Sequence, residues 1–143
     1  MEALREYARD VMGMASRLLS EDTDLDPIGL IVAELQEPYT VPLNFENDQL
    51  KRESCRDLVE RARRLKATAI VTVFTARARE LDAAVEDKSC VESSRAILVT
   101  LSGPHMRNWA LERPFEIREG VPVLGEIRTF EEGVALDFLP NWP

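Results

Sequence analysis

The segment from Arg95 to Ile117 limits the possible folds more than any other part of the chain. It reads as an apolar strand over residues 96–102, a tight turn at Gly103 and Pro104, and a second strand over residues 105–117. Strands joined by so short a turn pair antiparallel, because parallel strands need a much longer crossover connection. The sequence therefore predicts a hairpin inside a sheet.

One face of the second strand combines cations with apolar groups. Side chains two apart in a strand share a face, and this face carries His105, Arg107, Trp109, Leu111, Arg113, Phe115 and Ile117. An arginine supplies forked hydrogen-bond donors, and a tryptophan supplies a flat apolar wall. The candidate binding residues for an anion or a peptide are therefore His105, Arg107, Trp109 and Arg113.

A structural interpretation of the same face is favoured over the binding one. Apolar strand faces are usually core, and Arg107 and Arg113 can pair with acids such as Glu112 or Glu126. Pro114 donates no backbone hydrogen bond, so it is expected to confine this strand to a sheet edge or to a bulge.

Hydrophobic periodicity places the other elements. Residues 4–18 form an amphipathic helix, and Asn47 or Asp48 can cap a second helix that ends near Leu65. Residues 28–35 are apolar on both faces and read as a strand covered on both sides. With residues 68–76, they predict a strand–helix–strand unit with two parallel strands.

These elements predict an α+β fold, a two-layer α/β sandwich with two main helices in a single domain spanning residues 1–143. The sheet is expected to be mixed, with about five strands, the βαβ unit being followed by an antiparallel meander. The fifth strand covers residues 121–128, the Pro38 to Pro42 stretch is an extended connector, and a short sixth strand could occupy residues 134–138. Residues 77–94 could form a short helix or an acidic loop.

Composition excludes several classes of protein. The net charge of −8 argues against a general nucleic-acid binder, which needs a basic surface. The chain has no run of 18 apolar residues that could cross a membrane, and its first residues lack the apolar core of a signal peptide. Cys55 and Cys90 show no CxxC spacing, which favours a reducing, cytoplasmic compartment.

No catalytic, metal or cofactor motif is complete in the sequence. Asp22, Asp24 and Asp26 have the opening spacing of a calcium loop, but Pro27 and Ala33 stand where that loop needs glycine and glutamate. One histidine without a CxxC pair cannot build a structural zinc site. A Cys55–His105 pair would need a reactive thiolate, whereas Cys55 falls near the buried stripe of the second helix and is expected to be inert.

The order of strands and turns resembles small uncharacterised bacterial and phage domains. The features that carry the resemblance are TAIVTVFTA, an acidic loop, RAILVTLS, a tight turn and MRNWALERPFEI, and together they span roughly residues 67–130. The resemblance implies no activity, cofactor or site.

The sequence therefore predicts a non-enzymatic binding or assembly protein, acting as a homo-oligomer or with a protein partner. One alternative is a small metal-dependent hydrolase or nuclease that uses loop carboxylates with Lys88 or His105; the carboxylates are Glu80, Asp82, Glu86 and Asp87. A second alternative is an acidic protein that binds a basic partner surface.

Overall fold

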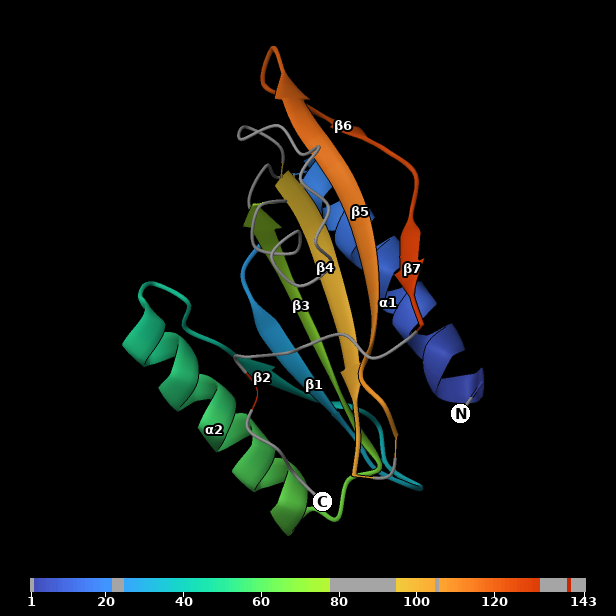
Figure 1. Ribbon diagram of the computed structural model, residues 1–143, viewed down its shortest axis with the longest axis vertical. Coiled ribbons are helices and arrows are strands. Elements are labelled where there is room, and N and C mark those ends of the chain that lie inside the picture. The colour runs from blue at the N-terminus through green and yellow to red at the C-terminus, as the bar shows by residue number, and fades with distance from the viewer. Residues whose placement is uncertain (1, 22–24, 78–94, 105, 132–138, 140–143) are drawn as a thin grey trace.

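The computed structural model describes residues 2–21, 25–77, 95–104, 106–131 and 139, and these build two helices and a seven-stranded sheet (Figure 1). The predicted α+β fold is confirmed. In chain order the elements are α1 (Glu2–Glu21), β1 (Ile28–Val32), β2 (Tyr39–Pro42), α2 (Asp48–Arg64), β3 (Ala69–Arg77), β4 (Arg95–Ser102), β5 (Trp109–Arg118), β6 (Val121–Leu124) and β7 (Arg128–Phe130).

Every strand pair of the sheet is antiparallel. The order is β2-β1-β3-β4-β5-β6, and β7 pairs with β5 next to β6. The predicted β4–β5 hairpin is present, with Leu101 opposite Trp109 and Arg95 opposite Phe115. In the described part of the chain, β2 and β6 are the ends of this strand order.

The predicted βαβ unit with parallel strands is wrong, because β1 and β3 run antiparallel, with Ile28 opposite Val73. The stretch expected to be a connector forms β2, which pairs with β1 and reverses the chain before α2 begins. Helix α2 then returns the chain to the end of β1, where the Thr68 amide donates to the Val32 carbonyl at 2.8 Å. The extra reversal makes the sheet wholly antiparallel instead of mixed.

The two helices cover opposite faces of the sheet, so the fold has three layers instead of the predicted two (Figure 1). Neighbouring residues of a strand point to opposite faces. Accordingly, Leu30 packs in the cluster under α1, while Ile31 packs in the cluster under α2. Strand β1 is covered on both sides, as its continuous apolar run predicts.

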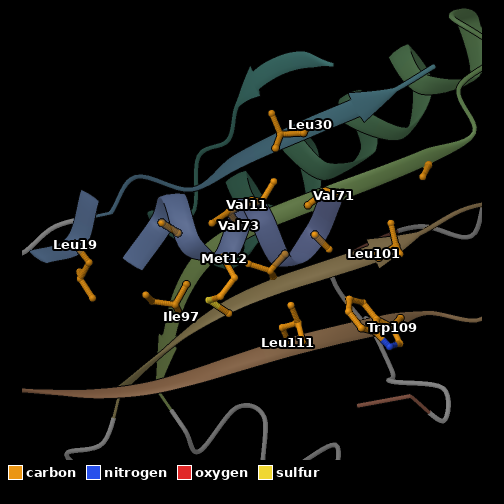
Figure 2. Close-up of a cluster of buried hydrophobic side chains, with 14 of the residues drawn as sticks. Val11, Met12, Leu19, Leu30, Val71, Val73, Ile97, Leu101, Trp109 and Leu111 are labelled. Atoms are coloured by element: carbon orange, nitrogen blue, oxygen red, sulfur yellow. The ribbon is translucent and has the colours of Figure 1, made fainter. Parts of the chain in front are cut away.

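Helix α1 contributes its apolar stripe to the larger cluster, which spans β1, β3, β4 and β5 (Figure 2). Trp109 lies at the end of this cluster opposite Leu19. The buried residues of α1 recur at helical spacing, as expected for an amphipathic helix that packs on a sheet; they are Ala8, Val11, Met12, Ala15, Ser16 and Leu19.

Helix α2 begins at a side-chain cap, as predicted. The Asn47 Oδ1 atom accepts a hydrogen bond from the Leu50 amide at 2.9 Å, which satisfies one of the free donors of the first turn. The helix approaches β1 very closely, because a Cβ atom on Gly29 would lie 2.6 Å from a methyl carbon of Leu58. Any larger residue at this position would have to displace the buried Leu58 side chain.

Strand β5 is flanked on both sides, contrary to the expectation that Pro114 would confine it to an edge or a bulge. Its register with β4 is continuous, and Pro114 lies opposite Ala96. On its other side β5 pairs with β7 through residues 110–112 and with β6 through residues 115–118. Pro114 falls in the gap between these partners, where the Gly125 amide donates to its carbonyl at 2.7 Å.

The predicted strand over residues 121–128 is interrupted: β6 ends at Leu124, residues 125–127 are not in a strand, and β7 begins at Arg128. Strands β5 and β6 are joined by a two-residue turn in which Glu119 and Gly120 both have positive φ, 53° and 77°. These angles are typical of the tight turn whose twist matches a hairpin. The possible sixth strand at residues 134–138 and most of the 77–94 segment lie outside the described residues.

Candidate functional site

The structure brings together only part of the predicted binding face. Trp109 and Arg113 share the α1 side of β5, and Arg107 is exposed just before the strand begins. His105 lies outside the described residues. Trp109 is only 1% exposed, so its ring is a core group, as the structural interpretation of this face predicts.

Two arginines of α1 cover the Trp109 ring. The guanidinium carbon of Arg5 lies 5.5 Å from the ring centroid, and that of Arg9 lies at 5.6 Å. Both distances are within the range of a cation–π interaction. Arg9 also forms an ion pair of 3.2 Å with Glu2.

Arg5 and Arg9 are not among the predicted site residues, although their spacing relative to buried residues could have identified them. Residues seven apart in a helix lie almost on one line, and Arg5 and Arg9 stand seven residues before Met12 and Ser16, both of which are buried. The two arginines therefore belong to the margin of the buried stripe. A cation at the margin of a buried helix stripe can lie over an aromatic side chain of the sheet on which the helix packs, as Arg5 and Arg9 do over Trp109.

Two hydrogen-bond donors in this cluster have no acceptor. The Trp109 Nε1 and Arg5 Nε atoms are buried and have no hydrogen-bond partner among the residues that the structure describes. The indole nitrogen lies on the edge of the ring turned away from Leu111 (Figure 2). A buried donor without an acceptor carries the full cost of its desolvation, about 1–3 kcal/mol. Both atoms lack the same kind of group, an acceptor oxygen.

Arg113 is held by neutral groups, so the predicted pairing with acids is wrong for this residue. Its Nε atom donates to the Gly125 carbonyl at 3.0 Å, and a terminal nitrogen donates to Ser16 Oγ at 3.1 Å. The first bond ties β5 to the segment after β6, and the second ties β5 to α1. Arg113 is therefore a structural residue, and its guanidinium is already engaged.

Glu112, one of the expected partners of the two arginines, lies on the opposite face of β5. Its carboxylate forms an ion pair of 3.3 Å with Arg128 of β7, and its side chain is 4% exposed. Arg107 forms no ion pair within the described part of the chain. Two guanidinium groups therefore lie over the Trp109 ring, and one of them, that of Arg9, is paired with the carboxylate of Glu2.

Cys55 has no features of a reactive cysteine. Its side chain is fully buried, and burial raises the pKa of the thiol to about 11, although the nearby Lys51 lowers it slightly. A thiol with so high a pKa is almost entirely protonated at neutral pH and is a poor nucleophile. Cys55 is a core residue, as predicted.

The residues of the predicted hydrolase site lie outside the described part of the chain; they are Glu80, Asp82, Glu86, Asp87, Lys88 and His105. Cys90 lies outside it as well. Among the residues that are described, no three histidine, cysteine, aspartate or glutamate side chains come together in a way that could hold a metal ion.

A second feature is the two-stranded end of the β5–β6 hairpin. Within the described residues, the pairing of β5 with β4 ends at Phe115, and residues 116–118 pair with β6 alone. In Figure 1 this end projects beyond β4. Its side chains include exposed apolar residues, namely Ile117, Val121 and Val123.

Comparisons of the chain with protein-family models, with curated proteins and with solved structures gave no match. Neither helix in the described part of the chain is long and apolar enough to cross a membrane. The candidate site must therefore be interpreted from its own geometry.

Proposed function

We propose that the protein is a cytoplasmic, non-enzymatic assembly protein that self-associates through the open edge of β6. The observation that supports this proposal is the projecting hairpin, whose terminal strand exposes Val121 and Val123, 60% and 41% exposed respectively. Because of Pro114, the strand that carries Trp109 and Phe115 is expected from the sequence to lie at a sheet edge or a bulge. Those residues are buried in an inner strand, so β6 takes the place of that edge.

The hydrogen bonds between β5 and β6 determine what the open edge of β6 presents. The Gly125 amide bonds to the Pro114 carbonyl, so residue pairs alternate from there between bonded and non-bonded. By this alternation the backbone N–H and C=O groups of Val121 and Val123 point toward β5. The backbone groups of Pro122 and Leu124 point away from β5, where a further strand can form hydrogen bonds with them.

A second copy of the chain fits this edge in an antiparallel arrangement with Val123 at the two-fold axis. In that register each Leu124 amide donates to the Pro122 carbonyl of the other copy, giving two backbone bonds. Pro122 has no amide hydrogen and cannot supply the remaining two. A proline on an edge strand limits uncontrolled pairing, so the expected association is specific but weak.

The local charge also suits a second copy. The strand from Val121 to Leu124 has no charged residue. Beside it, Glu116 and Arg118 neutralise each other in an ion pair of 2.6 Å. Two copies of net charge −8 repel one another at long range, and salt screens that repulsion. Association through this apolar, neutral strand should therefore increase with salt concentration.

Light scattering at tens of micromolar, with Val123→Lys as the test variant, examines this proposal. The wild-type protein should be a dimer, and Val123→Lys should be a monomer because two lysines would face each other at the axis. Leu35→Lys is the matched control, since Leu35 is an exposed apolar residue far from β6 along the strand order. A monomeric wild-type protein would contradict the proposal.

The Tyr39→Lys variant shows which of the two sheet edges, that of β2 or that of β6, mediates self-association. Tyr39 is exposed on β2, at the opposite end of the strand order. If Tyr39→Lys dissociates the dimer while Val123→Lys does not, the protein self-associates through β2 and the β6 assignment is wrong.

The alternative hydrolase hypothesis has its own test, because it predicts stabilisation by Mg²⁺, Mn²⁺ or Ca²⁺ in a melting experiment.

A further inference from the structure

We propose that Arg5 and Trp109 form a binding site for a carboxylate group. The site lies where the first half of α1 crosses the start of β5. It is separate from the β6 edge and does not depend on the proposed self-association.

The two unpartnered donors are the first argument. Trp109 Nε1–H and Arg5 Nε–H are both buried, both lack an acceptor, and both belong to side chains in contact with each other. A cation cannot satisfy either atom, because each can only donate. A group that binds both atoms must therefore supply acceptor oxygens.

The charge of the cluster is the second argument. Arg5 and Arg9 are four residues apart on one helix, a spacing at which like charges repel. Glu2 neutralises Arg9, whereas Arg5 forms no ion pair with any described residue. The chain as a whole has 26 acidic residues and 18 basic ones. Arg5 is thus an arginine without an ion pair on a buried tryptophan, and an anion would neutralise it.

Geometry favours a carboxylate over other anions. A guanidinium presents parallel N–H donors that match the two oxygens of a carboxylate. One of those oxygens can accept from the indole N–H at the same time. Because Trp109 is 1% exposed and its nitrogen is buried, a ligand reaches that nitrogen only when a covering side chain moves aside, and only a small planar group at the end of a chain fits so narrow an opening. Such a group can be a free dicarboxylate or the side chain of an acidic peptide.

Tryptophan fluorescence can test the site directly. The chain has two tryptophans, so Trp142→Phe leaves Trp109 as the only tryptophan fluorophore. We expect glutarate, or a short peptide rich in aspartate and glutamate, to change the Trp109 emission with a saturable dependence at constant ionic strength. Binding of both probes would indicate a site for the carboxylate itself. Binding of the peptide alone would identify an acidic segment as the ligand.

Two substitutions of Arg5 test whether carboxylate binding depends on its guanidinium group. Arg5→Gln should weaken binding about ten- to a hundredfold, because hydrogen bonds to charged groups are the stronger ones. Arg5→Lys keeps the charge but loses the forked donors, so it should bind with intermediate affinity. Arg64→Gln is the control, since Arg64 is an exposed arginine of α2 paired with Glu60.

The melting temperature gives a second readout that does not depend on fluorescence. A ligand that binds only the folded protein raises its melting temperature, and glutarate should do so for wild type and Arg64→Gln but not for Arg5→Gln. The proposal is overturned if neither probe changes the emission saturably, or if Arg5→Gln responds as the wild-type protein does. Val123→Lys should bind normally, which separates this test from that of self-association.

Discussion

Arg113 donates a hydrogen bond from Nε to the carbonyl oxygen of Gly125, at 3.0 Å. In a regular antiparallel pair this carbonyl would accept the amide hydrogen of residue 114. Residue 114 is a proline and has none, while the reverse bond, from the Gly125 amide to the Pro114 carbonyl, is present. The guanidinium of Arg113 therefore takes the place of the backbone N–H that Pro114 lacks and donates to the Gly125 carbonyl in its stead.

We expect Arg113→Met to lower the free energy of unfolding by about 1–3 kcal/mol, because it removes two hydrogen bonds of about 0.5–1.5 kcal/mol each. The second of these bonds connects the arginine to Ser16 of α1. Arg118→Met is the control and should change stability by less than about 0.5 kcal/mol, since Arg118 forms an exposed ion pair. Urea denaturation measures both values, and equal effects would contradict the assigned role of Arg113.

The claim that Arg113 takes the place of the amide N–H that Pro114 lacks can be tested separately. In a Pro114→Ala background, residue 114 regains an amide hydrogen that can bond to the Gly125 carbonyl. Arg113→Met should then cost less than it does beside proline, and a double-mutant cycle should give a coupling above about 0.5 kcal/mol. Additive effects of the two substitutions would mean that the Arg113–Gly125 bond does not replace the missing one.

Two glycines should respond in opposite directions to alanine. Gly29→Ala places a Cβ atom 2.6 Å from Leu58 and should destabilise the protein by about 1–3 kcal/mol through overpacking. Gly13 lies in α1, where an added Cβ atom would meet nothing within 4 Å, so Gly13→Ala should stabilise the protein by about 0.5–1 kcal/mol. Thermal melting of both variants tests this, and destabilisation by Gly13→Ala would contradict it.

Much of the fold could be predicted from local pattern. Both helices, the Asn47 cap, the β4–β5 hairpin and the apolar face of β5 follow from periodicity and side-chain chemistry. The direction of β3 could not be predicted in the same way, because an apolar strand looks alike in parallel and antiparallel sheets. Direction depended on whether the short stretch from Tyr39 to Pro42 pairs with β1, and two flanking prolines concealed that pairing.

Only part of the candidate site could be predicted from the sequence, and the reason differs from that for the fold. Trp109 and Arg113 could be identified because they alternate along one strand. Their partners Arg5 and Ser16 lie on α1, about a hundred residues earlier. A strand pattern shows which side chains share a face, whereas the groups that cover this face depend on the packing of a distant helix.

Glu119 occupies a backbone conformation that suits other residues better. Its φ of 53° is in the left-handed region, where asparagine and glycine are favoured. We expect Glu119→Asn to stabilise the protein by about 0.5–1 kcal/mol because the turn loses part of its strain. Glu131→Asn, at an exposed position without positive φ, is the control and should have little effect. Differential scanning calorimetry of the two variants provides the comparison, and equal shifts would argue against turn strain.

The thiol of Cys55 should make stability depend on alkaline pH. Burial raises its pKa from the ordinary value of 9.0 to about 11, so the folded protein holds this proton more tightly than the unfolded chain does. The resulting stabilisation is fully present below pH 9 and is lost as the pH rises toward 11, since only the unfolded chain ionises easily in that window. Urea denaturation between about pH 8 and about pH 11 should show a steeper decline for the wild-type protein than for Cys55→Ala. If the two proteins lose stability in parallel, the Cys55 thiol does not contribute to the decline.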